Sequence, residues 1–208
     1  MALVVPYAYR LELLEQPGMP GEVLERRKRL AAAAVLAALP LPLSAGEPSA
    51  LAAYAALLFP HDAPARARRM AASMSSCALW ALALWRLLGA EAPELDRPYV
   101  PGRAVADVVA VARRAGAWRP PSAELPAPGA GDALLVAPPE HVAVRQGPGL
   151  WVDGGQGPGG RSIGRARREV ERSPAGWRLG ARAVVGWVDL PALPLPREAY
   201  VPEGASLD

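Results

Sequence analysis

The sequence predicts an α+β fold, with helices in the first half of the chain and antiparallel strands in the second. Apolar residues recur at helical spacing up to about residue 129 and then alternate, which is the pattern of half-buried strands. At 208 residues, 51% of them hydrophobic, the chain is long enough to bury a core. We expect one domain, formed by an N-terminal helical layer (1–70), a core (71–190) and a proline-rich tail (191–208).

Two helices are expected before the core. The segment 22–39 begins with charged residues, becomes alanine-rich and is stopped by Pro40. The segment 44–58 has Pro48 in its first turn and Pro60 just after its end, which is typical of a short helix. Both segments belong to the helical layer that we expect to pack around the core.

The helix expected over 77–88 is the most apolar one in the core. Ser75 and Ser76 are good N-caps for it, and Gly89 is a good residue to end it. Apolar residues lie on nearly every side of this helix, so we expect it to be buried on several faces. A further helix is expected over 104–115.

Alternating apolar residues and turn residues predict the strands of an antiparallel sheet. The expected strands cover 131–136, 141–146, 150–154 and 183–189. A Gly-Pro-Gly turn at 147–149 joins the second strand to the third, and the last strand is expected to close the sheet. The glycine-rich segment 154–160 is expected to be a rim loop, and the tail is expected to wrap the surface.

Composition argues against several classes of partner. The net charge of +3 comes mostly from arginine, including Arg165, Arg167 and Arg168, which we expect to form a solvated face. Aromatic residues are not interleaved with the basic ones, so no nucleic acid partner is expected. One cysteine and two histidines argue against a structural zinc site, and we expect neither a metal nor a cofactor. No stretch has the pattern of a targeting signal or a membrane span, which leaves open a cytoplasmic location, export by a signal-less route and the oligomeric state.

Cys77 is the only cysteine of the chain, and it falls in the first turn of an expected helix. Unpaired N–H groups and the positive end of the helix dipole favour a thiolate at such a position. His141 begins an expected strand, and Asp153 lies on the next one. A cysteine, a histidine and an acid in this order, on a helix and two strands, are typical of a papain-like cysteine hydrolase.

The hairpin between the second and third strands predicts how the histidine and the acid are placed. If the turn pairs Gln146 with Leu150, Asp153 is the diagonal neighbour of His141 and both point to one face of the sheet. Asp153 is then able to accept a hydrogen bond from the imidazole and leave the other ring nitrogen for the thiol. Ala143 lies on the same face, and we expect the cysteine-bearing helix to approach there.

Other assignments stay open at this point. A lone cysteine in an apolar segment is often a core residue. His61 is the competing histidine, Gln156 is an alternative third residue, and Glu140 is placed to tune the neighbouring histidine. The Cys77 backbone N–H is a natural oxyanion donor, and Ser76 and Gln156 are secondary candidates at the oxyanion site.

Several of these stretches together resemble the NlpC/P60 superfamily of papain-like cysteine peptidases. They are Ser76-Cys77 at the start of an apolar helix, Gly131 to Val136, His141 to Val144, and Trp151 to Asp153. The resemblance covers roughly residues 70–156 and implies an antiparallel sheet packed against the cysteine-bearing helix. It also implies amide hydrolysis, often of peptidoglycan stem peptides. This chain has Ser76 where the superfamily usually has aspartate, and Asp153 where histidine is common.

We therefore expect a bacterial cysteine peptidase or amidase of papain-like NlpC/P60 type, with extra N-terminal helices. The expected partner is peptidoglycan or another peptide-like substrate. One alternative is a papain-like amidase or acyltransferase that acts on a different substrate. The other is a catalytically inactive binding module of the same fold.

Overall fold

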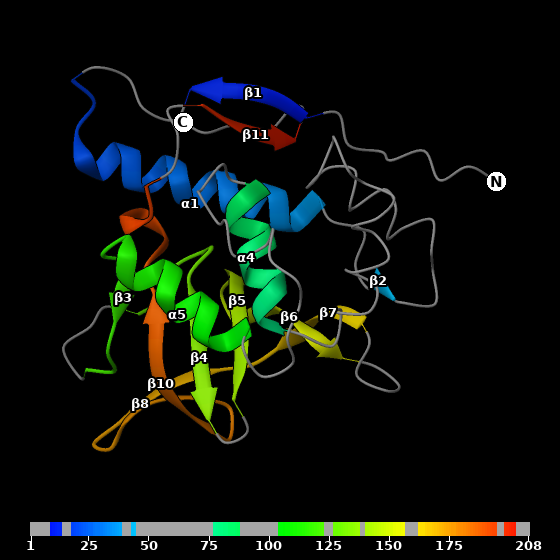
Figure 1. Cartoon of the computed structure of the whole chain (residues 1–208), viewed down its shortest axis with the longest axis vertical. Helices are drawn as coiled ribbons and strands as arrows, with labels where there is room; N and C mark the ends of the chain where they lie inside the picture. Colours follow the sequence, from blue (N-terminus) through cyan, green and yellow to red (C-terminus); the bar gives the residue numbers. More distant parts are fainter. Residues whose placement is uncertain are drawn as a thin grey trace.

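The computed structural model describes the chain in nine segments. They are residues 9–13, 18–38, 43–44, 77–87, 104–122, 127–137, 140–156, 162–194 and 198–202. Within them, helices pack against a curved antiparallel sheet that forms a half-barrel (Figure 1). The α+β prediction is therefore confirmed.

The α-helices of the described segments lie where the sequence places them, and a short 3-10 helix was not expected. The helices are α1 (Gly21–Ala38), α4 (Cys77–Leu87), α5 (Ala104–Arg114) and the short 3-10 helix η3 (Leu190–Ala192). The helix expected over 44–58 falls outside the described residues, apart from Ser44, which belongs to a strand instead. None of the described helices combines the length and apolar character that crossing a membrane requires.

The strands are more numerous than the sequence predicts. They are β1 (Tyr9–Leu13), β2 (Leu43–Ser44), β3 (Trp118–Arg119), β4 (Ala133–Ala137), β5 (His141–Gly147), β6 (Leu150–Gln156), β7 (Ser162–Arg167), β8 (Val170–Ser173), β9 (Gly176–Leu179), β10 (Arg182–Val188) and β11 (Glu198–Pro202). Only β4, β5, β6 and β10 were expected. The predicted rim loop is wrong at its start, because β6 continues to Gln156, and residues 157–160 lie outside the described part.

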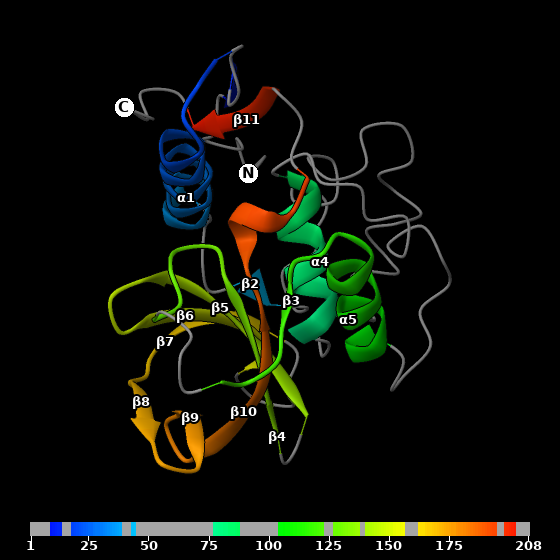
Figure 2. The ribbon, with the colours of Figure 1, turned by 90° about the vertical axis from the view of Figure 1, so that its left-hand side faces the viewer.

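Among the described residues, nine strands form one antiparallel sheet in the order β2-β7-β6-β5-β4-β10-β9-β8, and β3 pairs with β10. Strand β10 pairs with β4 on one side and with β9 on the other, so the expectation that it closes the sheet is wrong. The tail does more than wrap the surface, since β11 pairs with β1 in a separate two-stranded sheet. Figure 2 shows how the main sheet curls, so that the β8–β9 hairpin faces back toward the central strands.

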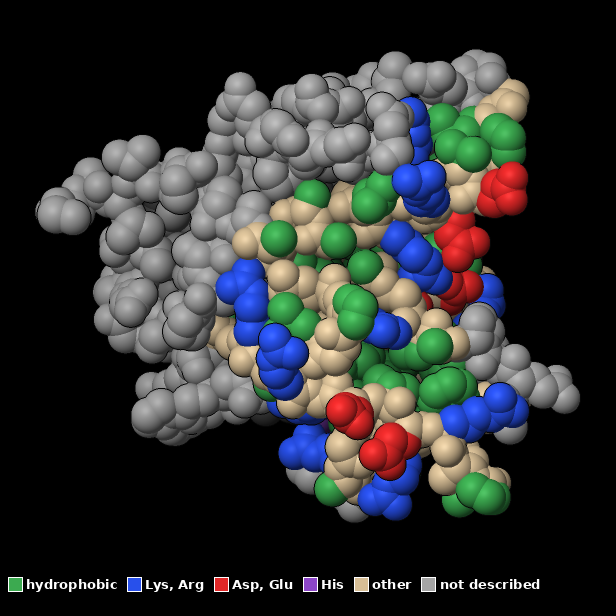
Figure 3. All heavy atoms as spheres, turned by 180° about the vertical axis from the view of Figure 1, so that it is seen from behind, with side chains coloured by type: hydrophobic (Ala, Val, Ile, Leu, Met, Phe, Trp, Pro, Cys, Tyr) green, Lys and Arg blue, Asp and Glu red, His purple; other side chains and the backbone are tan. Residues whose placement is uncertain are grey.

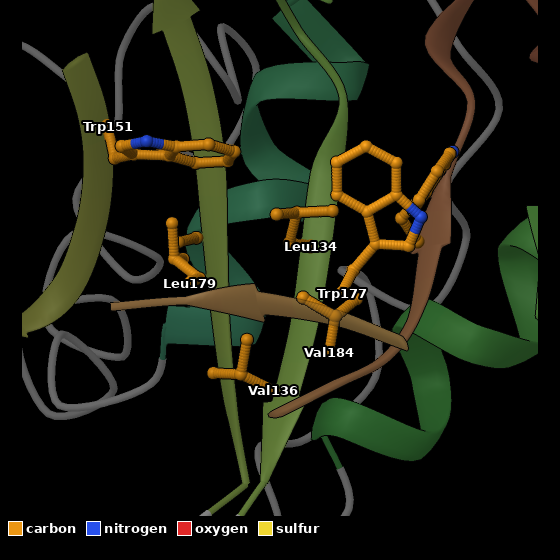
Figure 4. Close-up of a cluster of buried hydrophobic side chains, with 8 residues drawn as sticks. Leu134, Val136, Trp151, Trp177, Leu179 and Val184 are labelled. Carbon is orange, nitrogen blue, oxygen red and sulfur yellow. The ribbon is translucent and has the colours of Figure 1, made fainter. Parts of the chain in front are cut away.

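The concave face of the curled sheet is filled by buried apolar side chains, which we call the tryptophan cluster (Figure 4). Its members are Leu134, Val136, Ala143, Trp151, Trp177, Leu179, Val184 and Trp187. Trp177 and Trp187 meet edge to face, with ring centroids 6.0 Å apart and planes at 81°, an arrangement that aromatic quadrupoles favour. The cluster fixes the β8–β9 hairpin over β4 and β5.

Helix α4 lies on the opposite face of the sheet from the tryptophan cluster, behind β4 and β5 in Figure 4. The expectation that the helix approaches the face of Ala143 is therefore wrong, because Ala143 belongs to the cluster. Successive side chains of a strand point to opposite faces, so Val142 and Val144 of β5 bury themselves on the helix side. The helix reaches the site from behind β5.

A buried aspartate ties the scaffold together at the start of β4. Asp132 is 2% exposed, and its carboxylate accepts hydrogen bonds from Gly129 N at 2.7 Å, Leu190 N at 2.9 Å and Arg29 Nη1 at 3.0 Å. Burial raises the pKa of Asp132, and the charge of Arg29 opposes that rise. Gly131 precedes it with a φ of +84°, and a Cβ there would meet the Leu190 side chain. The Gly-Asp pair thus joins α1, β4 and η3.

Charged side chains of the described residues are dispersed over the surface. Figure 3 shows Lys and Arg side chains distributed over one face of the molecule, with acidic side chains between some of them. On that face the basic residues do not merge into a single large patch. This distribution is typical of a solvated surface.

Replacing Asp132 with Ala should lower the free energy of unfolding by about 3 kcal/mol, because it leaves Arg29 and two backbone N–H groups without their buried partner. Glu25→Ala is the matched control. It removes the exposed partner of the same arginine and should cost only about 0.5 kcal/mol. Guanidinium chloride denaturation measures both, and equal losses would contradict the role given to Asp132.

Candidate active site

The thiol of Cys77 lies at the junction of helix α4 and strand β5. Cys77 is the first residue of α4, and its Sγ accepts a hydrogen bond from Val142 N at 3.2 Å. The residue is 7% exposed. Both the helix start and the Val142 amide direct positive partial charge at the sulfur.

The imidazole of His141 is held by a buried carboxylate. His141 begins β5, and its Nε2 lies 2.7 Å from Asp153 Oδ2 on β6. The Cys77 thiol lies close enough to the His141 ring to raise the pKa of the imidazole. Because Nε2 is engaged by Asp153, the ring nitrogen left for the thiol is Nδ1. The structure thus brings all three side chains together.

The pairing of β5 with β6 explains why His141 meets Asp153. Val144 pairs with Val152, as the expected register requires. At the turn, however, Leu150 pairs with Gly147 and not with Gln146, because a β-bulge takes up one residue. The bulge lies beyond the site, so the diagonal relation inferred from the sequence holds where the histidine and the acid lie.

Opposing effects set the protonation of His141. Burial is the largest and lowers the pKa of the imidazole, since it penalises the charged form. The hydrogen bond to Asp153 and the interactions with the neighbouring Cys77 and Asp153 outweigh it and raise the pKa of His141 to about 9. At neutral pH the ring is therefore an imidazolium, and it lies beside the thiol.

Arg168 is a member of the site that the sequence does not reveal. Its Nη1 lies 2.5 Å from Asp153 Oδ2, so the two side chains form an ion pair. The geometry of this contact does not meet the criteria for a hydrogen bond. Asp153 is fully buried, and among the described residues its Oδ1 has no hydrogen-bond partner. Arg168 is fixed by its backbone, which donates to Gly149 O and accepts from Trp151 Nε1, both at 3.0 Å.

Arg168 was expected to be part of a solvated arginine face, and for this residue the expectation is wrong. Its guanidinium group, 25% exposed, lies against a buried carboxylate. The sequence contains only an indirect indication of this ion pair. A buried aspartate needs a compensating cation, and arginines lie on the strand after β6 and directly after its end. Choosing among them requires the β6–β7 register.

The remaining sequence candidates are placed only in part. Ser76 and His61 lie outside the described residues. Gln156 ends β6, but its side chain is not described, so its roles stay predictions. Glu140 is exposed in the turn before β5. No group of three or more His, Cys, Asp and Glu side chains able to hold a metal ion gathers within the described part of the chain.

No family model, curated protein or solved structure matches the chain. Function is therefore inferred from the chemistry of the site. A thiol beside an imidazole that a buried carboxylate orients is the arrangement that activates a nucleophile for acyl transfer.

The imidazole of His141 should titrate near pH 9, against an ordinary value of 6.5. Since the pKa is raised by folding, the stabilisation is complete below pH 6.5 and is lost as the pH rises through 9. Asp153→Asn should lower the midpoint toward 6.5. Histidine NMR on the whole chain measures this, with His61 as the only other resonance. An unshifted midpoint near 6.5 that Asp153→Asn does not change would contradict the assignment.

Proposed function

We propose that this protein is a cysteine hydrolase that cleaves amide bonds. Cys77 is the nucleophile, His141 acts first as general base and then as general acid, and Asp153 orients the imidazole. The observation that carries the proposal is the convergence of the chain's only cysteine, at the start of a helix, with an imidazole that a buried carboxylate holds.

In the proposed reaction His141, as general base, takes the proton of the Cys77 thiol, and the sulfur attacks the amide carbonyl and forms a C–S bond. Negative charge develops on the carbonyl oxygen, where the Cys77 backbone N–H is a donor, and Ser76 and Gln156 are secondary candidates. The His141 imidazolium gives its proton to the leaving amine as the C–N bond breaks. The neutral ring then takes a proton from water, whose oxygen attacks the thioester. The C–S bond breaks, the acid is released, and the Cys77 thiolate and the His141 imidazolium are restored.

The fold supports a papain-like hydrolase of NlpC/P60 type. A helix that begins with the cysteine packs behind an antiparallel sheet whose strand β5 begins with the histidine. The Gly131-Asp132 pair at the start of β4, part of the resemblance, lies in the scaffold that holds β4. On this basis we propose peptide bonds of peptidoglycan stem peptides as the substrate.

The test is hydrolysis of purified muropeptides, followed by chromatography. Cys77→Ala and His141→Ala should each reduce the rate by at least about 10³-fold, because a nucleophile and its base act as a unit. His61→Ala is the matched control and should keep most of the activity. Loss with His61→Ala and retention with His141→Ala would contradict the proposal.

Alkylation of Cys77 by iodoacetamide tests the reactivity of the thiol independently of the substrate. Rapid labelling below pH 7 that slows in His141→Ala supports the activated thiol. If such a protein left muropeptides intact but cleaved another amide, the peptidoglycan assignment would fall and the cysteine hydrolase would stand. Labelling as slow as that of a free cysteine peptide would make Cys77 a core residue.

A further inference from the structure

A pocket opens beside the candidate active site, on the concave face of the sheet. Its volume is about 280 Å³. This is slightly below the usual range for drug-sized ligands and suits a group about as large as one amino acid residue. His141 forms one wall, and the β9–β10 turn, with Gly180 and Ala181, forms another.

The pocket is strongly basic. Arg168 and Arg182 line it together with His141, and its lining includes no acidic side chain from the described residues. Arg168 uses one guanidinium nitrogen on Asp153, and a guanidinium carries five N–H donors. Among the described residues, Arg182 has no acidic side chain paired with it.

The rest of the lining is apolar. Val136 and Leu179, both members of the tryptophan cluster, are 1% and 3% exposed and close the inner end of the pocket. A suitable ligand therefore joins an anionic group to a short apolar portion. Planar guanidinium groups bind carboxylates in a bidentate manner, and a carboxylate is the anion that peptides carry.

The His141 ring connects the pocket to the thiol, because the same ring lines the pocket and lies near enough to Cys77 for the thiol to affect its pKa. A group bound in the pocket is one imidazole ring away from the nucleophile. We propose that this pocket is a subsite for a carboxylate carried by the substrate residue next to the scissile amide. The substrate part of this inference rests on the proposed hydrolase function.

Binding of two small probes tests the subsite on the whole chain. N-Acetylalanine carries the carboxylate, and N-acetylalaninamide is the same molecule without the charge. The acid should shift the His141 imidazole NMR signal saturably, and the amide should bind at least about tenfold more weakly. Arg182→Ala, and the less disruptive Arg182→Gln, should weaken binding of the acid by about 10- to 100-fold.

Arg172→Ala is the matched control, because this substitution removes the same charge as Arg182→Ala. Arg172 is exposed on β8 and does not line the pocket. Equal binding of acid and amide, or equal losses in Arg172→Ala and Arg182→Ala, would overturn the subsite. Carboxylate-selective binding in a protein that hydrolyses no amide would keep the subsite and overturn the hydrolase. Amide hydrolysis without any preference for the acid would do the reverse.

Discussion

The site depends on a single buried charge, the carboxylate of Asp153. A fully buried carboxylate is costly unless it is matched, and here His141 and Arg168 approach the same oxygen. The pairing fixes the imidazole through Nε2, and the imidazole in turn faces the thiol of Cys77. Three parts of the fold thereby meet: β5, β6 and the connection after β7.

A second buried carboxylate supports the strand on which this site is built. Asp132 joins α1 and η3 to the start of β4, and its backbone oxygen accepts a hydrogen bond from Arg145 N of β5. Strand β5 therefore has its register set on one side by β4 and on the other by β6. Because His141 begins that strand, the position of its ring depends on the scaffold as well as on Asp153. The buried carboxylate of Asp132 thus stabilises the scaffold, and the buried carboxylate of Asp153 orients the imidazole of the site.

Local patterns were enough to predict the parts of the fold that are apolar and periodic. The cysteine-bearing helix, the strands β4, β5, β6 and β10, and the diagonal relation of His141 to Asp153 all follow from spacing and parity. The β8–β9 hairpin was not expected, because each of its strands is only four residues long and β8 has no buried residue. Strand β11 pairs with β1 from the other end of the chain, a long-range contact without a local signal.

The site itself was harder to predict where it depends on tertiary structure. The approach of the helix behind β5, the bulge at Gly147 and the choice of Arg168 are set by packing and register. Spacing in a sequence does not distinguish the two faces of a sheet when both are buried.

The most direct measurement is the mass of Cys77 during turnover. Muropeptides are mixed with the wild-type chain, the reaction is quenched in acid within its first turnovers, and the cysteine-containing peptide is analysed by mass spectrometry. Nucleophilic catalysis predicts an acyl adduct bound as a thioester to Cys77, present in proportion to the enzyme and lost on treatment with hydroxylamine. Continuing cleavage of an amide substrate while Cys77 stays unmodified at every time point would contradict the account.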